Sequence, residues 1–147
     1  MRSAYTILEL IFVIVIIGIL ASIAIIKFNL TREDSIVVER LSNIKIATNE
    51  IISYAATKNQ LSHNILNMSN ALKLMVSENQ ADLENNRSIK VKIKNTYCIK
   101  LKVEEKDTTA LVKIENINSQ NNLCKTLQNK INILNYPIQI KGTIIAY

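Results

Sequence analysis

The chain is poor in the residues that build tight turns, metal sites and disulfide scaffolds. Its 147 residues include two glycines, one proline, one histidine, two cysteines and no tryptophan. So few glycines and prolines predict long helices and regular strands rather than elaborate loops. One histidine and two widely spaced cysteines do not supply the ligand set of a zinc site. The sequence therefore predicts no bound metal and no cofactor.

Signatures of enzymatic sites are also missing. The sequence has no glycine-rich phosphate loop, no HExxH motif and no pair of carboxylates at a spacing that suggests acid–base chemistry. The acidic residues Glu104, Glu105 and Asp107 lack the ligand rhythm of a calcium loop and have lysine neighbours. His63 lies in a polar stretch, where we expect a solvated loop residue. We expect no enzymatic activity.

A long apolar run stands near the N-terminus instead. Residues 10–26 read LIFVIVIIGILASIAII and carry no charge. Extended back to Tyr5, the run reaches the roughly 20 residues that a helix needs to cross a hydrocarbon core. Its small residues, Gly18 and Ser22 among them, favour close packing between helices. Glu9 interrupts the run, and an acid within a membrane costs at least ~2.5–3.5 kcal/mol and usually has a partner.

The residues from Ala4 to Leu10 resemble the processing and N-methylation motif of type IV pilins and type II secretion pseudopilins. Members of that family have a short basic leader, a small residue before the cut, an aromatic first mature residue and a glutamate at the fifth mature position. The resemblance implies cleavage between Ala4 and Tyr5 by a prepilin peptidase, followed by methylation of the Tyr5 amine. It also implies that Thr6 and Glu9 serve assembly, with Glu9 meeting the amine of a neighbouring subunit.

Three residues depart from the usual family pattern. Ala4 replaces the preferred glycine before the cut, Tyr5 replaces phenylalanine, and Ile26 stands where many pilins have a proline. Because that proline kinks the helix, its absence predicts a straighter one.

The resemblance divides the chain into three parts. They are a leader (1–4), a transmembrane and assembly helix (5–26) and a periplasmic globular domain (27–147). It implies a subunit of a type IV pilus or a type II secretion pseudopilus, serving secretion, DNA uptake or adhesion. Its partners would be other subunits, the prepilin peptidase, the inner-membrane assembly platform and membrane lipid. The protein would start as a single-pass inner-membrane protein and end in a periplasmic or surface filament.

An ordinary uncleaved anchor carrying a periplasmic sensor or binding domain is the alternative. Charge also opposes the expected orientation, because basic residues normally stay on the cytoplasmic side. Arg2 alone precedes the apolar run, whereas four basic residues follow it at Lys27, Arg32, Arg40 and Lys45. We give the motif and the cysteine pair precedence over this charge count.

Helical periodicity continues beyond the apolar run. Apolar residues recur at helical spacing from Val37 to Ala55, which predicts the second half of one long helix. A separate amphipathic helix, restarting at Ser35 after a break in residues 29–35, is the alternative. A short helix is expected over Asn70–Glu78, and another over Gln120–Leu134 ahead of Pro137.

From Ser88 onward the period changes to two, which predicts an antiparallel hairpin. A three-residue loop over Lys94–Thr96 would pair Ile93 with Tyr97 and Val91 with Ile99, keeping one face apolar. Further strands are expected over residues 109–115 and 138–146. The predicted fold class is α+β, with a long N-terminal helix packed on a small antiparallel sheet, as in pilins.

The polar face of this hairpin carries lysines. Lys90 would face Lys100 across the strands, with Lys92 and Lys102 nearby. Because like charges directly opposite are destabilising, an anion such as a DNA phosphate is a candidate ligand for these four lysines. A plain solvated face is the alternative, since no aromatic residues are interleaved for base stacking.

Two modifications remain as candidates. Asn86 lies in Glu84-Asn85-Asn86-Arg87-Ser88, which resembles the extended acceptor for bacterial N-glycosylation. Cys98 and Cys124 would form one disulfide in an exported domain, or two buried thiols in a cytosolic one. We expect Cys98 on the polar face of its strand, so that a bridge to Cys124 clamps the C-terminal segment there, as in many pilins.

Overall fold

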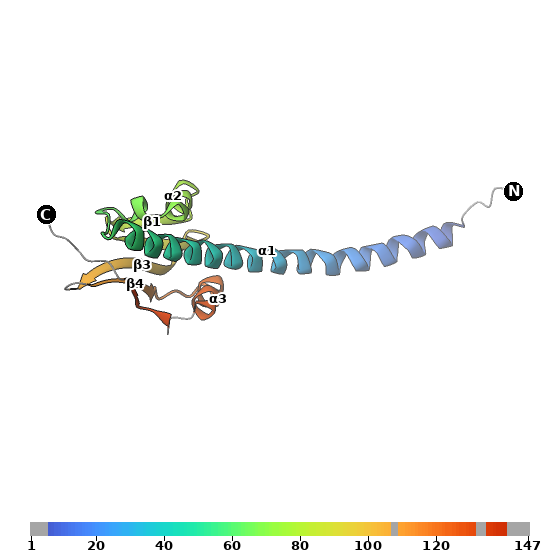
Figure 1. Cartoon of the computed structure of the whole chain (residues 1–147). Helices are drawn as coiled ribbons and strands as arrows, with labels where there is room; N and C mark the ends of the chain where they lie inside the picture. The colour runs from blue at the N-terminus through green and yellow to red at the C-terminus, as the bar shows by residue number, and fades with distance from the viewer. Residues whose placement is uncertain (1–5, 107–108, 132–134, 141–147) are drawn as a thin grey trace. The chain divides into compact units, whose positions relative to one another are not determined.

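A computed structural model describes residues 6–106, 109–131 and 135–140 of the chain, with the side chains of residues 23–31 and 106 left out. It is an α+β structure whose first element, α1 (Ile7–Lys58), is helical throughout (Figure 1). No break interrupts α1 between residues 29 and 35, and the Ser35 hydroxyl donates to the Arg32 carbonyl at 2.8 Å. The alternative of a helix restarting at Ser35 is therefore wrong.

The chain divides into two units within α1, one ending at Ser35 and the other beginning at Ile36. The second unit continues with a 3-10 helix η1 (Ile65–Met68), α2 (Asn70–Ser77), β1 (Ala81–Asn85) and β2 (Ser88–Ile93). It ends with β3 (Thr96–Lys106), β4 (Thr109–Asn116), α3 (Asn122–Lys130) and β5 (Ile138–Ile140).

The five strands form one antiparallel sheet in the order β1-β2-β3-β4-β5. Alternate residues of β2, β3 and β4 are buried, as a sheet with one packed face requires. These residues share a core with α1 residues Val37, Ile44, Ala47, Ile51 and Ala55. The predicted helical stripe from Val37 to Ala55 and the predicted period-two strands are thus confirmed.

The β2–β3 hairpin turns more tightly than its sequence predicts. Its loop has two residues, Lys94 and Asn95, with φ of 47° and 63°. Positive φ at both positions is the mark of a type I′ turn, whose twist suits a hairpin. The predicted pairing of Ile93 with Tyr97 is wrong, because Ile93 pairs with Thr96.

A bulge then restores the predicted register. Lys92 pairs with Tyr97 and Val91 with Ile99, so Cys98 is the extra residue on β3. The predicted pairing of Val91 with Ile99 is confirmed. Tyr97 consequently lies on the polar face, and Cys98 is fully buried rather than on that face as expected.

The remaining elements agree with the sequence in part. The helix α2 and the strand β4 match the expected segments within one residue. α3 is shorter than predicted and gives way to the cap residue Ile131. Residues 132–134 and 141–146, where longer elements were expected, lie outside the described residues. The edge strand β1 was not predicted.

Candidate functional site

Thr6 and Glu9 form a cap at the start of α1. The Glu9 carboxylate accepts hydrogen bonds at Oε2 from the Thr6 backbone N–H at 2.9 Å and the Thr6 hydroxyl at 3.1 Å. The Thr6 hydroxyl in turn accepts from the Glu9 backbone N–H at 3.3 Å. This reciprocal arrangement is a capping box, in which a threonine and a glutamate three residues later satisfy each other's free donors.

The capping role of Glu9 was missed at the sequence level, although the Thr-x-x-Glu spacing signals it. Within the described residues, all hydrogen bonds to the carboxylate reach Oε2, so Oε1 has no partner there. The carboxylate can therefore cap its own helix and still accept a donor from outside. Ala4 and Tyr5, the predicted cleavage pair, lie outside the described residues.

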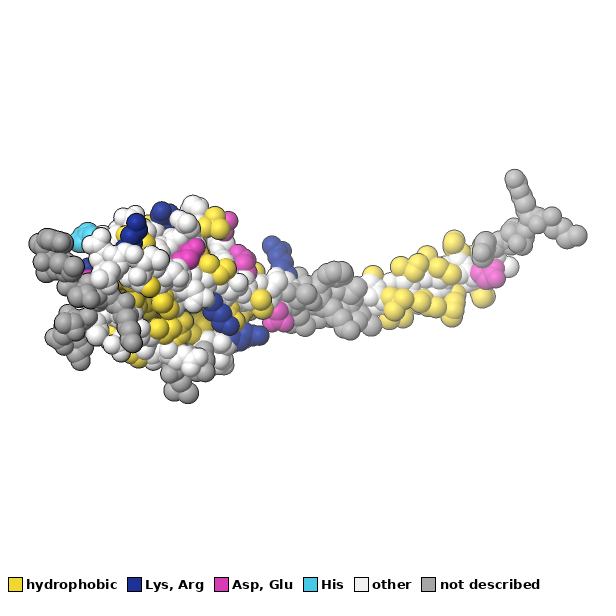
Figure 2. All heavy atoms as spheres, in the orientation of Figure 1, with side chains coloured by type: hydrophobic (Ala, Val, Ile, Leu, Met, Phe, Trp, Pro, Cys, Tyr) yellow, Lys and Arg dark blue, Asp and Glu magenta, His cyan; other side chains and the backbone are white. Residues whose placement is uncertain are grey.

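Apolar side chains occupy successive positions along the N-terminal part of α1, and Figure 2 shows a group of them on the side in view. Twelve large ones between Ile7 and Leu20 are exposed, from 40% for Ile16 to 80% for Ile7. A helix that is apolar all round is stable in water only when something else covers it. Nothing in the described part of this chain does so.

A small patch on this helix is shaped for close approach. A Cβ added at Gly18 would meet no atom within 4 Å. The Ser22 hydroxyl donates a hydrogen bond to the Gly18 carbonyl at 2.9 Å, so its donor already has a partner within the helix. Small residues one turn apart let two helix backbones come near each other.

Among the described residues, no helix combines the length and the apolar character needed to cross a membrane.

The lysine face of the sheet is interleaved with carboxylates. Lys90 pairs with Glu84 at 2.9 Å, and Lys100 pairs with the same carboxylate. Lys92 pairs with Asp82 at 2.8 Å. Lys102 sits between Glu104, at 2.8 Å, and Glu115. Opposite charges therefore alternate across β1–β4, and the predicted facing of Lys90 and Lys100 is confirmed.

Some of these contacts shift the pKa values of the groups that they join. Hydrogen bonds from Lys100 and Lys90 lower the pKa of Glu84 from its ordinary 4.5 to about 2. Hydrogen bonds from Lys102 and Lys113 lower the pKa of Glu104 to about 2 as well. Glu84 raises the pKa of Lys90, and Glu104 and then Glu115 raise the pKa of Lys102, so these two lysines stay charged.

Carboxylates shared between lysines relieve their mutual repulsion without an external anion. Lys90 also lies 5.8 Å from the centre of the Tyr97 ring, whose hydroxyl donates to Asp82 at 2.8 Å. A phosphate backbone approaching this face would meet four acids along with the lysines. The geometry favours the solvated face over the DNA contact proposed from Lys90, Lys92, Lys100 and Lys102.

Asn86 lies exposed in the turn between β1 and β2. Its side-chain amide nitrogen is 2.8 Å from His63 Nε2. Its backbone carbonyl accepts a hydrogen bond from the Ile65 backbone N–H at 2.7 Å. Ser88, the third residue of the candidate acceptor, is buried and donates its hydroxyl to Glu84 at 3.0 Å. The candidate acceptor thus combines an exposed Asn86 with a buried Ser88.

Cys98 and Cys124 form a disulfide between the β3 bulge and α3. Both residues are fully buried. Gln128, one turn after Cys124, donates its amide to the carbonyls of Cys98 at 2.6 Å and Ile117 at 2.8 Å. The bridge and the amide together hold α3 against the sheet. Within the described segments, no three His, Cys, Asp or Glu side chains gather where they could hold a metal ion.

Comparisons of the chain with protein-family models, with curated proteins and with solved structures find no match. Two features distinguish the molecule: an exposed apolar helix headed by a capped glutamate, and a domain closed by one disulfide. The structure brings together Thr6 with Glu9, Cys98 with Cys124, and the four lysines with their acids.

Proposed function

We propose that the protein is a structural subunit of a type IV pilus or a type II secretion pseudopilus, assembled through its N-terminal helix. The observation that carries the proposal is the unpartnered apolar surface from Ile7 to Leu20, with one carboxylate at its head. Such a surface needs either lipid or other helices around it. A filament subunit uses both in turn, lipid before assembly and neighbouring helices afterwards.

Glu9 would set the register between helices in the filament. Removal of residues 1–4 frees the α-amine of Tyr5, which carries a positive charge and N–H groups that can donate hydrogen bonds. Because an isolated charge in an apolar bundle is costly, the amine of one subunit and the carboxylate of the next stabilise each other in one alignment. The Oε1 atom of Glu9, which has no partner among the described residues, supplies the acceptor.

The domain fits an exported subunit. A disulfide persists in oxidising compartments such as the periplasm, and Cys98–Cys124 joins α3 to the sheet. We accordingly place the precursor in the inner membrane, with the domain in the periplasm and the prepilin peptidase and assembly platform as partners. The mature protein then enters a periplasmic or surface filament.

Mass spectrometry of the purified protein tests the first step. We expect a mature chain that begins at Tyr5 and carries a methyl group on its α-amine. Retention of Met1 would refute the proposal and fit an uncleaved anchor on a sensor or binding domain.

Two substitutions at Glu9 test its role in assembly. Glu9→Gln keeps the capping box, since glutamine also serves at that position, but removes the charge. We expect Glu9→Gln and Glu9→Leu to lower filament yield by about tenfold or more, the equivalent of one ~1.4 kcal/mol contact per subunit, while the leader is still removed.

Thr6→Val is the control for the cap. It removes the hydroxyl of the capping box but leaves the Glu9 charge. We expect Thr6→Val to assemble far better than Glu9→Gln. Equal losses in Thr6→Val and Glu9→Leu, with normal assembly of Glu9→Gln, would mean that Glu9 acts only as a helix cap.

A further inference from the structure

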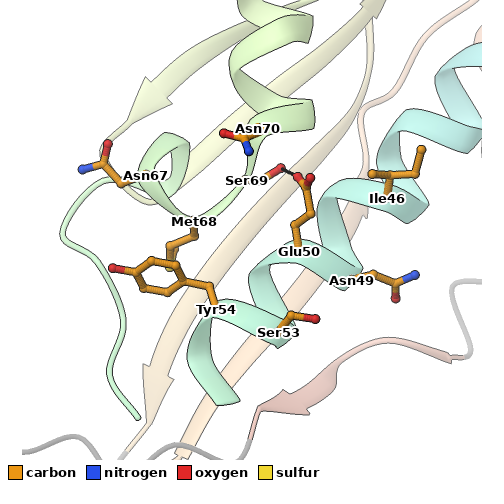
Figure 3. Close-up of a pocket in the computed structure, with 9 residues that line it drawn as sticks. All are labelled: Ile46, Asn49, Glu50, Ser53, Tyr54, Asn67, Met68, Ser69 and Asn70. Atoms are coloured by element: carbon orange, nitrogen blue, oxygen red, sulfur yellow. Dashed lines mark hydrogen bonds between the residues drawn. The ribbon is translucent and has the colours of Figure 1, made fainter. Parts of the chain in front are cut away.

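An open hollow of about 430 Å³ lies between α1 and the η1–α2 segment (Figure 3). Polar side chains supply much of its lining, namely Asn49 and Ser53 from α1 and Asn67 and Asn70 from the facing segment. Glu50 is the one charged residue in the lining. Figure 3 shows the Glu50 side chain leaving α1 toward Ser69.

The Glu50 carboxylate is held in place by one of its oxygens. Oε2 accepts from the Ser69 hydroxyl at 2.6 Å and from the Ala71 backbone N–H at 3.0 Å. Ser69 is itself fixed, because its hydroxyl accepts from the Leu72 backbone N–H at 3.1 Å as the cap of α2. Because the Glu50 side chain is already ordered in the folded domain, a ligand that binds it loses little affinity to side-chain ordering.

The second oxygen of Glu50 remains open to the hollow. Oε1 accepts no hydrogen bond from the described residues. Every buried side-chain oxygen among the described residues has a hydrogen-bond partner. Because Oε1 has none, it is not fully buried and lies within reach of solvent. A carboxylate has about four acceptor positions, and half of those on Glu50 stay available.

Glu50 forms no ion pair with the described residues, unlike most acids of the domain. Six of them pair with lysine or arginine: Glu39, Asp82, Glu84, Glu104, Glu105 and Glu115. No described Lys or Arg pairs with Glu50, although the chain has a formal net charge of +6. A partly buried carboxylate without a cation gains most from one that arrives from outside.

The lining suits an ammonium group. An ammonium brings three donors and no acceptor. The Glu50 carboxylate can accept one of them, and the lining also contains the amides of Asn49, Asn67 and Asn70, whose oxygens are further acceptors. The same carboxylate repels anions, which disfavours phosphates and acidic side chains as occupants.

A matching cationic surface lies on the other flank of α1. A second hollow, of about 200 Å³, has Lys45 and Lys130 in its lining beside Leu41, Ile44 and Ile131. Both lysines are exposed and form no ion pair with the described residues. Lys45 and Glu50 are five residues apart, which places them about 140° apart around the helix.

Resting on the proposed function, we propose that the Glu50 hollow receives a lysine ammonium from the Lys45 and Lys130 surface of a second copy of this chain. A filament is built by contacts between two different patches of identical subunits, repeated without closure. One acidic and one basic patch on separate flanks of α1 meet that requirement. The contact orients the domains, while the N-terminal helices supply the bulk of the association.

Chemical cross-linking of assembled filaments tests the contact directly. A carbodiimide joins a carboxylate to an amine only where the two touch. In filaments mixed from unlabelled and nitrogen-15-labelled subunits, we expect a mixed-label peptide joining Glu50 to Lys45 or Lys130. The cross-link should vanish in subunits dispersed by detergent. Glu50 joined to neither lysine in intact filaments would overturn the inference.

Substitutions give an independent measure. Glu50→Gln keeps an acceptor for Ser69 and Ala71 but loses the charge, so the fold is retained. We expect the yield of sheared filaments to fall by about tenfold. Glu78→Gln is the matched control, because Glu78 is exposed, accepts from Gln80 at 2.5 Å and forms no ion pair with described residues. A filament yield for Glu50→Gln equal to that for Glu78→Gln would contradict the contact.

Charge exchange completes the test. Glu50→Lys and the double variant Lys45→Glu with Lys130→Glu should each lower assembly, and the triple variant should recover it. Failure of the triple variant to recover, with each protein melting as the wild type does, would overturn the inference. Wild-type filaments together with any of these negative results leave the proposed function standing. Absence of wild-type filaments would refute the proposed function instead.

Discussion

The two units of the chain treat apolar side chains in opposite ways. In the domain from Ile36 onward, Ile44, Ile51 and Leu101 are at most 1% exposed. In the N-terminal unit, no large apolar residue from Ile7 to Leu20 is less than 40% exposed. Each such side chain would gain roughly 1.5–3 kcal/mol from full burial. The domain buries its apolar side chains within itself, whereas those of the N-terminal helix stay exposed and available for burial against a partner.

The largest expected effect contrasts the same substitution in the two units. Ile51→Ala in the domain core should lower the free energy of unfolding by about 2–5 kcal/mol, because it leaves a cavity. Ile14→Ala, at a residue 58% exposed, should leave the domain's unfolding unchanged and lower filament yield instead. Chemical denaturation followed by circular dichroism, with filament yield in parallel, measures both. A destabilised domain in Ile14→Ala would break the contrast.

The disulfide should affect the domain alone. It joins residues 26 positions apart, and its loss should cost roughly 2–4 kcal/mol, chiefly by freeing the unfolded chain. The variant Cys98→Ala with Cys124→Ala avoids an unpaired thiol. The melting temperature of the domain should fall, while removal of the leader should proceed as in the wild type. An unchanged melting temperature would mean that Gln128 and the packing of α3 suffice.

The smallest expected effect comes from pH. Glu84 and Glu104 have pKa values of about 2 in the folded protein, against 4.5 ordinarily. Their ion pairs therefore stabilise the fold above pH 4.5, and this stabilisation is lost as the pH falls from 4.5 toward 2. Solvent exposure keeps the effect small. Glu84→Gln with Glu104→Gln should show a weaker drop in melting temperature between pH 5 and pH 2.5 than the wild type.

Periodic patterns predicted most of the domain. The apolar stripe of α1 and the alternation in β2, β3 and β4 follow directly from which faces are buried. The strand β1 escaped prediction because Ala81 is its only fully buried residue and the rest of this edge strand is partly or fully exposed. The bulge at Cys98 escaped because Lys94-Asn95 is not among the usual signals of a type I′ turn.

Pairings across strands escaped prediction for a different reason. Glu84 lies on β1, while the lysines that share it lie on β2 and β3. Sequence shows that lysines line one face, but only the register shows that acids from β1 and β4 stand between them. The same limit applies to Glu50, whose partners Ser69 and Ala71 lie about twenty residues away. The cap of Thr6 and Glu9, by contrast, is local and could have been predicted.

Cys98 is a residue that the hairpin does not need for its own pairing. With Lys94 and Asn95 at the turn, β2 and β3 would close into a regular ladder if Cys98 were deleted, and every other side chain would keep its face. Its place in the chain is thus explained by the bridge to Cys124. A deletion of Cys98 combined with Cys124→Ala should yield the same sheet, with α3 no longer linked to it by a disulfide. Such a variant would show that the sheet forms independently of the bridge that attaches α3.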